Sequence, residues 1–328
     1  MIKFENVSKK YPDGTTAVTD LNMEIEQGEF FVIIGPSGSG KTTTLKMVNR
    51  LIPLSEGTIF INDKKISEYD IHELRWNIGY VLQRIALFPH MSIEENIAIV
   101  PELKKWERDK IRKRVCELLE MVGLDPNIYL HRKPKELSGG QQQRVGVIRA
   151  LAANPEIVLM DEPFSALDPI SREKLQDDII SIQKSIQKTT IFVTHDMQEA
   201  MKLADRICIM KDGEVVQIGT PLEIMENPVN QFVKDFVGHQ PNRFGGDLRL
   251  ETIVQPFTEG GTPYAVTATE VIPVSTSLHD VLKKLAFHEQ LIVEKNRTQI
   301  GMINRQMMMN YLAEHLIEDG MNRGKNHG

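Results

Sequence analysis

A glycine-rich segment with the sequence GPSGSGKT spans residues 35–42. It follows an apolar run, residues 29–34, that is typical of a buried strand, and it leads into residues 41–51, which have the pattern of a helix. Glycines at such a junction permit backbone angles that other residues avoid, so that backbone N–H groups and the helix N-terminus can surround a phosphate group. The segment therefore predicts an α/β domain with a phosphate-binding loop.

A second motif, LSGGQ, occupies residues 137–141, about a hundred positions after the loop. Ser138 and Gln141 have the S-x-x-Q spacing of a capping box, so we expect a helix to begin at Ser138. Gly139 and Gly140 would let the positive end of that helix approach a phosphate closely. The two motifs in this order resemble one family, the ATP-binding subunits of ABC transporters.

The resemblance implies a fold class and a domain organisation. We expect an α/β, P-loop NTPase fold in residues 1–241, an ABC ATPase domain with a RecA-like core, an antiparallel β subdomain and a helical subdomain at about 84–152. Residues 242–270 contain two Gly-Gly pairs and are predicted to be a linker. Residues 271–318 resemble a single CBS motif, a small α+β domain. Residues 319–328 are polar, and we predict that they form a disordered tail.

The resemblance also assigns roles within the loop. Lys41 would place a point charge on the β- and γ-phosphates of ATP, and Thr42 would ligate Mg²⁺. Tyr11 matches the family position that stacks on adenine, although a tyrosine near an early strand can equally be structural. Further residues that we expect to bind ATP are Gly35, Ser37, Gly38, Gly40 and Thr43.

An acid pair, Asp161 and Glu162, closes the apolar run of residues 157–160. Acid pairs after strands are often solvated turns, but the position of this one after a phosphate loop favours a catalytic role. Asp161 would hold Mg²⁺, and Glu162 would act as the general base that deprotonates the attacking water.

Two further residues match positions near the γ-phosphate in the family. His195 follows the strand-like run of residues 190–194 and would help to orient the water. Gln83 fits the family's Q-loop, which contacts Mg²⁺ and water and senses the transmembrane partner. Phe88, shortly after it, is either a core residue or a contact for a cytoplasmic helix of a permease. Asp168 matches the D-loop that links two ATP sites, and it is also an ordinary helix start before proline.

The family's architecture implies partners. The signature motif of one subunit covers the ATP of the other, so we expect a head-to-tail homodimer that binds two MgATP. No run approaches the ~20 apolar residues of a membrane span. The chain begins directly in a strand-like segment. We therefore expect a peripheral protein at the cytoplasmic face of the cell membrane, in complex with integral-membrane permease subunits and an extracytoplasmic substrate-binding protein.

Charge and cysteine content restrict the partners and the cellular compartment that this chain can have. The chain has 328 residues and a formal net charge of −6, which argues against nucleic acid as the main partner. Its two cysteines, Cys116 and Cys208, lie far apart in apolar segments, which indicates buried thiols in a reducing compartment and not a disulfide.

The CBS-like tail narrows the resemblance to the ATPases of osmoprotectant importers, which take up glycine betaine, carnitine or choline. In that family the tail senses ionic conditions or a cyclic dinucleotide, whereas a plain dimerisation appendage is the alternative here. Other functions remain open: an importer of another small polar solute such as an amino acid or amine, a soluble ABC ATPase, or a regulatory module for which ATP is only a ligand.

Overall fold

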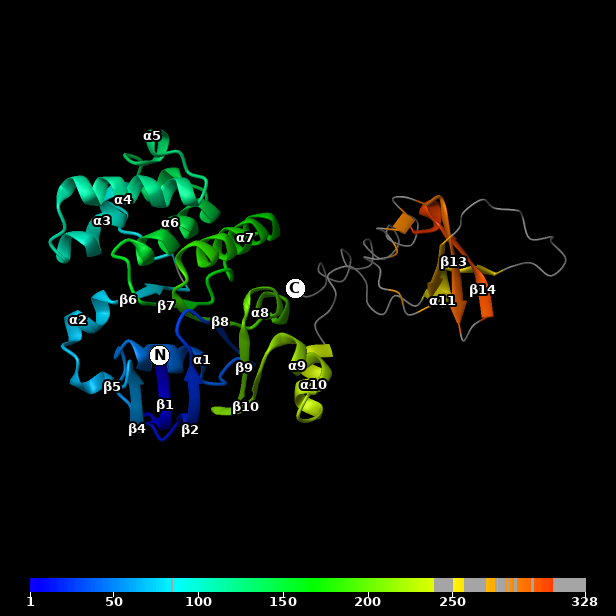
Figure 1. Cartoon of the computed structure of the whole chain (residues 1–328), viewed down its shortest axis with the longest axis horizontal. Coiled ribbons are helices and arrows are strands. Elements are labelled where there is room, and N and C mark those ends of the chain that lie inside the picture. Colours follow the sequence, from blue (N-terminus) through cyan, green and yellow to red (C-terminus); the bar gives the residue numbers. More distant parts are fainter. Residues whose placement is uncertain are drawn as a thin grey trace, which may run out of the picture. The chain divides into compact units, whose positions relative to one another are not determined.

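The structure is a computed structural model in which the chain divides into two compact units, Met1–Gln240 and Pro241–Gly328 (Figure 1). The first unit ends one residue before the domain boundary that we predicted at residue 241. The described residues are 1–83, 85–238, 250–256, 270–274, 276, 281, 284–285, 288–295 and 298–308.

A six-stranded sheet forms the centre of the first unit, with the strand order β10-β9-β3-β8-β7-β6. All neighbouring strands are parallel except the β9–β10 hairpin. Every residue of β3, β7 and β8 is buried, as the continuous apolar runs of a covered parallel sheet require. The strands are β3 (Phe30–Ile34), β6 (Ile78–Val81), β7 (Ile157–Asp161), β8 (Thr189–Thr194), β9 (Arg206–Lys211) and β10 (Glu214–Gly219).

An antiparallel sheet, in the order β2-β1-β4-β5, packs beside it. Buried and exposed residues largely alternate along its strands, so that one face carries apolar side chains. That face shares an apolar core with Phe31 and Ile33 of β3. The strands are β1 (Ile2–Lys10), β2 (Thr16–Ile25), β4 (Glu56–Ile61) and β5 (Lys64–Lys65).

Helices cover the central sheet, and α3 to α6 form a separate group on its far side from the antiparallel sheet (Figure 1). The group falls within the range 84–152 that we predicted for a helical subdomain. The helices are α1 (Lys41–Val48), α2 (Ile71–Trp76), α3 (Ile93–Leu103), α4 (Arg108–Met121), α5 (Pro126–Tyr129), α6 (Gly139–Leu151), α7 (Pro169–Ile186), α8 (Met197–Leu203), α9 (Pro221–Glu226) and α10 (Gln231–Gly238), with 3₁₀ turns at Ile66–Glu68 and Pro134–Glu136.

The described part of the second unit is a four-stranded sheet in the order β11-β14-β13-β12. Its elements are α11 (Leu250–Ile253), β11 (Gln255–Pro256), β12 (Glu270–Pro273), β13 (Gln290–Lys295) and β14 (Thr298–Asn304).

The range 242–270, which we predicted to be a linker, therefore includes a helix and a strand. Leu250 and Ile253 are buried in the apolar core of the second unit, and this burial outweighs the turn-forming glycines on which the prediction rested. The predicted disordered tail, residues 319–328, lies outside the described residues.

Both cysteines are free thiols. Cys208 is fully buried, and Cys116 is half-buried. Burial raises the pKa of the Cys208 thiol to about 12, so that this thiol stays protonated and unreactive at neutral pH.

Candidate active site

The predicted phosphate loop connects β3 to α1 and is held closely by neighbouring backbone. A Cβ atom on Gly35 would lie 2.1 Å from the Met210 carbonyl oxygen of β9, and one on Gly40 would lie 2.5 Å from the carbonyl oxygen of Ala17. Gly38 and Gly40 also have positive φ angles of 82° and 95°. Only glycine fits these positions, so the backbone lines the loop and its N–H groups are available to an anion.

Lys41 is the cation of this loop. Its side chain is buried, and its ammonium group donates hydrogen bonds of 2.8 Å to the carbonyl oxygens of Gly35 and Pro36. Burial lowers the pKa of Lys41, and the nearby carboxylates of Glu162 and Asp161 oppose that effect.

Polar groups of the same loop fit a phosphate ligand. The hydroxyl oxygen of Ser39 is buried without a hydrogen-bond partner. Ser37 and Gly38 are exposed, and Thr43 is half-buried in the first turn of α1. The cradle thus offers a cation, a glycine-rich backbone and an unpaired hydroxyl, which together suit the phosphate groups of a nucleotide.

Thr42 and Asp161 meet beside the loop. The Thr42 hydroxyl donates a 2.7 Å hydrogen bond to Asp161 Oδ1, and the Tyr80 hydroxyl lies 3.4 Å from Asp161 Oδ2. Burial raises the pKa of Asp161, and burial together with the Asp161 charge raises the pKa of Tyr80. A carboxylate and a hydroxyl are oxygen ligands of the kind that Mg²⁺ prefers, so this pair fits the predicted metal ligands.

Two of the three predicted catalytic residues contact the same carboxylate oxygen of the third. Gln83 Nε2 donates a 3.3 Å hydrogen bond to Glu162 Oε2, and His195 Nδ1 lies 3.2 Å from the same atom. The three residues follow β6, β7 and β8, whose carboxyl ends lie at one edge of the parallel sheet.

The backbone at Glu162 has a φ angle of 44°. Its N–H donates to the Val193 carbonyl oxygen at 3.0 Å, and its own carbonyl oxygen accepts from the Ser165 hydroxyl at 3.0 Å. These bonds on both sides fix the direction in which the Glu162 side chain leaves the strand.

Tyr11 lies at the end of β1, in a turn beside the phosphate loop. Its N–H donates to the Thr15 carbonyl oxygen at 2.8 Å, two residues before Ala17, whose carbonyl group flanks Gly40. The ring is half-buried, and Lys9 Nζ lies 5.1 Å from its centroid. The turn therefore leads from Tyr11 to the backbone that flanks Gly40, and the stacking of its ring on adenine stays a prediction.

The signature residues begin α6 as a capping box. Ser138 Oγ accepts from the Gln141 N–H at 3.3 Å, and Gln141 Oε1 accepts from the Ser138 N–H at 2.9 Å. A Cβ atom on Gly140 would lie 2.9 Å from Ser171 Oγ, whereas one on Gly139 would meet no atom within 4 Å. The start of α6 therefore contacts the start of α7 and leaves Gly139 open.

Asp168 caps α7 by accepting a 3.0 Å hydrogen bond from the Ser171 N–H, and hydrogen bonds from Ser171 lower the pKa of Asp168. Among the described residues, no hydrogen bond or ion pair joins the signature residues to Lys41 or Glu162. The signature of this chain thus lies apart from its own phosphate loop, and α6 and α1 are well separated in Figure 1.

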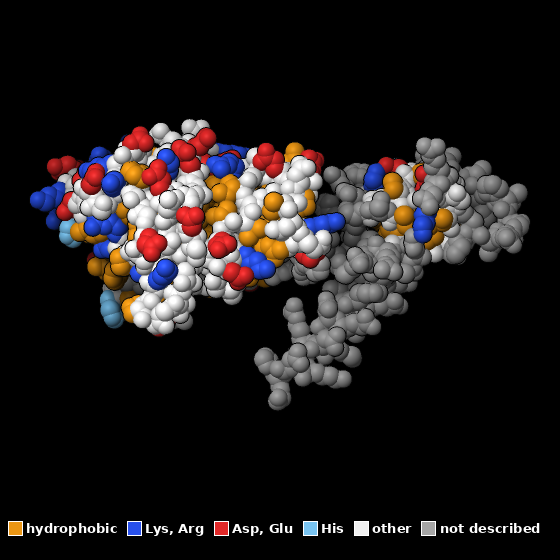
Figure 2. Space-filling model, turned by 90° about the horizontal axis from the view of Figure 1, so that it is seen from below, with side chains coloured by type: hydrophobic (Ala, Val, Ile, Leu, Met, Phe, Trp, Pro, Cys, Tyr) orange, Lys and Arg blue, Asp and Glu red, His pale blue; other side chains and the backbone are white. Residues whose placement is uncertain are grey.

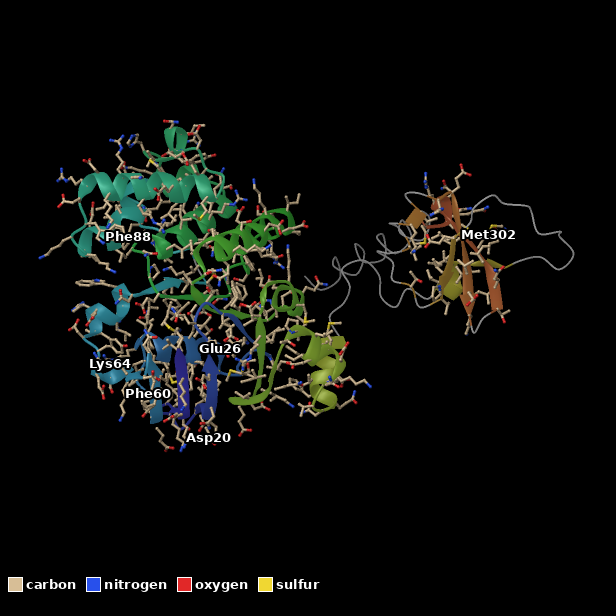
Figure 3. The ribbon with its side chains drawn as sticks, viewed as in Figure 1. Asp20, Glu26, Phe60, Lys64, Phe88 and Met302 are labelled. Carbon is tan, nitrogen blue, oxygen red and sulfur yellow. The ribbon has the colours of Figure 1, made fainter. Side chains whose placement is uncertain are left out.

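Phe88 is 51% exposed and is not a core residue. Its backbone is fixed by Asn96, whose side chain accepts from the Phe88 N–H at 2.8 Å and donates to the Phe88 carbonyl oxygen at 3.1 Å. Arg149 of α6 donates a 2.6 Å hydrogen bond to the Ala86 carbonyl oxygen. The loop therefore holds an apolar ring at the surface (Figure 3).

Sequence reasoning missed several residues that contact the site or the loop beside it: Tyr80, Arg149, Arg172 and Glu199. They carry no motif signal. Tyr80 lies in an apolar run, and the others lie in helices where a polar residue usually faces solvent. Only their position in three dimensions shows that they contact site residues or the backbone beside them.

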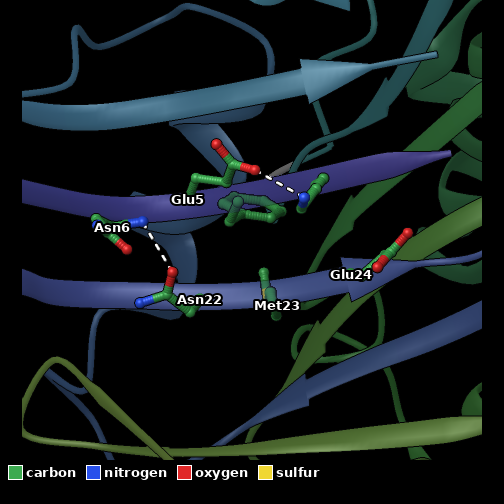
Figure 4. A pocket seen from close by; sticks show the side chains of 7 residues that line it. Glu5, Asn6, Asn22, Met23 and Glu24 are labelled. Carbon is green, nitrogen blue, oxygen red and sulfur yellow. Dashed lines mark hydrogen bonds and ion pairs between the residues drawn. The ribbon is translucent and has the colours of Figure 1, made fainter. Parts of the chain in front are cut away.

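A wide groove of about 490 Å³ lies elsewhere, on the antiparallel sheet (Figure 4). An ion pair of 2.7 Å between Lys3 and Glu5 lines it, and Asn22 accepts there from the Asn6 N–H at 2.9 Å. None of its residues is a predicted site residue, so the groove is separate from the phosphate loop and its partners.

Comparison with known proteins places the chain and its fold in a family. A family model described as ABC transporter matches residues 18–165. The chain is 48% identical to the glycine betaine/carnitine/choline transport ATP-binding protein OpuCA of Bacillus subtilis over 94% of this chain and 79% of that protein. The chain belongs to the ABC transporter family. A carnitine transport ATP-binding protein OpuCA of Listeria monocytogenes is 60% identical over 73% of this chain and 60% of its own length.

A solved structure of the same family has this fold. The ATP-binding cassette MJ0796, in a dimeric post-hydrolysis state bound to ADP and Pi, is 38% identical to the chain, with a TM-score of 0.61 over 67% of this chain and 99% of that one. None of the helices in the described ranges of this ABC transporter chain has the length and hydropathy that a membrane span requires. Figure 2 shows acidic and basic side chains interspersed on one face of the first unit.

Proposed function

We propose that the chain is the ATP-hydrolysing subunit that energises import of a quaternary-amine osmoprotectant, namely glycine betaine, carnitine or choline, through a membrane permease. The observation that carries the ATPase assignment is the convergence of Gln83 and His195 on Glu162, next to Thr42 and Asp161. The substrate assignment is supported by relatives whose names specify these solutes.

The phosphate loop at residues 35–42 would bind the nucleotide. Lys41 and the loop amides would hold the β- and γ-phosphates, the Ser39 hydroxyl would gain a phosphate oxygen as partner, and Tyr11 would stack on the adenine ring. Thr42, Gln83 and Asp161 would hold Mg²⁺, which would supply positive charge to neutralise the phosphates. Removal of Lys41 should therefore weaken ATP binding as well as hydrolysis.

Hydrolysis depends on the free oxygen of Glu162. Because Gln83 and His195 both contact Oε2, Oε1 can accept the proton of a water molecule placed against the γ-phosphate. The two neighbours then keep the carboxylate oriented toward that water, as a positioned general base requires. Since these residues already meet in the chain, a role for ATP as a mere ligand is the weaker alternative.

A homodimer would complete the site. Because Ser138 and Gly139 lie apart from the phosphate loop of their own chain, we propose that they cover the γ-phosphate bound by the partner subunit, with α6 directing its positive end at the anion. Asp168 would lie near the junction of the two sites. The dimeric state of the related cassette MJ0796 supports this arrangement.

Membrane partners would dock at the exposed loop that carries Phe88. We propose that the chain lies at the cytoplasmic face of the membrane, bound to integral-membrane permease subunits that receive substrate from an extracytoplasmic binding protein. The second unit would be regulatory, with ionic strength or a cyclic dinucleotide as its signal. A single CBS-like motif would need the copy from the second subunit to form a full module.

Uptake by the reconstituted complex tests this function. The full chain and its permease in proteoliposomes, with the ATPase and ATP enclosed in the lumen and the binding protein outside, should accumulate labelled glycine betaine, carnitine or choline added to the outside. Glu162→Gln should abolish uptake. Accumulation of none of these solutes, with ATP hydrolysis intact, would overturn the substrate assignment and leave the ATPase assignment standing.

A further inference from the structure

A second polar cluster lies behind the catalytic pair and takes no part in the proposed hydrolysis steps. Arg172, in the first turn of α7, faces two carboxylates: its Nη1 lies 3.8 Å from Asp196 Oδ2, and its Nε lies 4.0 Å from Glu199 Oε1. The Thr194 hydroxyl donates to Glu199 Oε2. Glu199 is only 5% exposed, so the cluster brings a buried carboxylate to the back of the site.

A small polar cavity separates this cluster from the general base. It has a volume of about 40 Å³, enough for at least one water molecule at ~10–15 Å³ each. Arg172 Nε is buried and has no hydrogen-bond partner, so a water molecule here would meet an unpaired donor. The cavity is lined by Glu162, Ser165, Arg172, Thr194, His195 and Glu199.

The cluster also connects the start of α7, which carries Asp168, with the segment that carries His195. The Arg172 N–H donates to the Asp168 carbonyl oxygen at 2.9 Å in the first turn of α7. On the other side, Asp196 caps α8 by accepting from the Gln198 N–H at 2.8 Å and from the Glu199 N–H at 3.4 Å. His195 lies between Thr194 and Asp196 in the chain, and both of these residues belong to the cluster. Arg172 therefore connects the start of α7 with the segment that carries His195.

We propose that Arg172 and Glu199 are positioning residues for ATP hydrolysis, which hold the start of α7, with Asp168, in a fixed position relative to His195. This inference rests on the proposed ATPase function. A movement of Asp168 at the dimer junction would then be transmitted to His195, and so to the carboxylate of Glu162. The coupling acts through a charge pair and a polar cavity, and neither residue needs to touch the nucleotide.

Electrostatics supports this role. Burial raises the pKa of Glu199 to about 7, although the Thr194 hydrogen bond and Arg172 lower it, while Asp196 raises it and His195 lowers it. Glu162 and Ser165 face the Glu199 carboxyl across the cavity. Near neutral pH the carboxyl is therefore only partly ionised, and protonation removes the charge that attracts Arg172.

Steady-state ATPase kinetics of the full chain test the proposal. Arg172→Gln and Glu199→Gln should each lower kcat about tenfold, because small misplacements of catalytic groups are costly, whereas KM for ATP should change less than twofold. Arg172→Lys, which keeps the charge, should recover part of the loss. In the wild type, kcat should fall as pH drops from 8 to 6, and Glu199→Gln should lose this component.

A matched control exists on the same two helices. Lys202 of α8 donates a 2.7 Å hydrogen bond to Asp177 of α7 at the surface, so Asp177→Asn removes a charge pair between α7 and α8 without changing the cavity. Its kcat and pH profile should match the wild type. If Glu199→Gln fails to fold, the double variant with Arg172→Gln, which leaves no unpaired buried charge, should fold and show the same low, pH-insensitive kcat.

Two failures can be distinguished. A full chain that does not hydrolyse ATP would overturn the proposed function itself. A chain that hydrolyses ATP, but whose folded Arg172 and Glu199 variants keep the kcat and pH profile of the wild type, would overturn only the positioning role.

Discussion

The two units of the chain differ in what they bury. Among the described residues, every buried polar or charged side chain lies in the first unit, including Lys41, Asp161 and Glu199. The core of the second unit is apolar, and its ion pairs, such as that between Lys284 and Glu270, are about one-third exposed. Burial of charge is costly unless it is paired. The first unit therefore contains buried charges that lower its stability, some of them at the candidate active site, whereas the described core of the second unit contains only apolar side chains.

The largest effect that tests this comparison is at Glu162. Glu162→Gln keeps the shape of the side chain but removes its basicity, so kcat for ATP hydrolysis should fall about 10²–10⁴-fold. ATP affinity, measured by equilibrium binding of a fluorescent ATP analogue, should remain within about threefold. Glu294→Gln, a half-buried carboxylate of the second unit, is the matched control and should leave kcat unchanged. Wild-type turnover by Glu162→Gln would refute the base assignment.

Burial of Glu199 predicts a pH-dependent stability in the first unit. Because its folded pKa is about 7 and its ordinary value is 4.5, the folded state binds more protons between these values. The contribution of this group to stability is therefore greatest below pH 4.5, falls as pH rises to about 7, and then stays constant, a total of about 3 kcal/mol.

Urea unfolding at several pH values between 5 and 8 measures this slope. The free energy of unfolding of Glu199→Gln, relative to the wild type, should rise with pH by a large part of that amount. Asp177→Asn, on the neighbouring helix, should run parallel to the wild type. A Glu199→Gln curve that also runs parallel would mean that the carboxyl is not destabilised by burial.

The sequence predicted more of the first unit than of the second. That the loop at residues 35–42, the acid pair and His195 meet could be expected from the sequence, because each follows an apolar strand-like run and parallel strands end at the same edge of a sheet. The roles of Arg172 and Glu199 could not, because they arise only where α7 packs beside α8. In the second unit, the Gly-Gly pairs suggested a linker, and only the burial of Leu250 and Ile253 shows that helix and strand begin within it.

A smaller effect is expected in the second unit, at Gly301. A Cβ atom there would lie 2.3 Å from the Gln255 carbonyl oxygen, so Gly301→Ala should push β11 away from β14 and destabilise this unit by about 1–3 kcal/mol. Thr298→Ala, exposed on the same strand, is the control and should have little effect.

Calorimetry of the full chain can resolve this change if the two units unfold separately. The transition of the second unit should move to a lower temperature in Gly301→Ala, whereas ATPase kcat should stay within twofold, since the site lies wholly in Met1–Gln240. A large loss of ATPase activity would instead show that the second unit controls the first, and would sharpen the regulatory proposal.

The smallest effect concerns the surface pair between Lys202 and Asp177, whose side chains are 36% and 63% exposed. Exposed ion pairs contribute only about 0–1 kcal/mol because water and salt screen them, so Asp177→Asn should change the free energy of unfolding by no more than that. The change should shrink further in 1 M NaCl, where the screening length falls to about 3 Å. A loss of several kcal/mol would mean that the Lys202–Asp177 pair is not screened by solvent, and that ion pairs at the surface of the first unit cannot be set apart from charges in its interior.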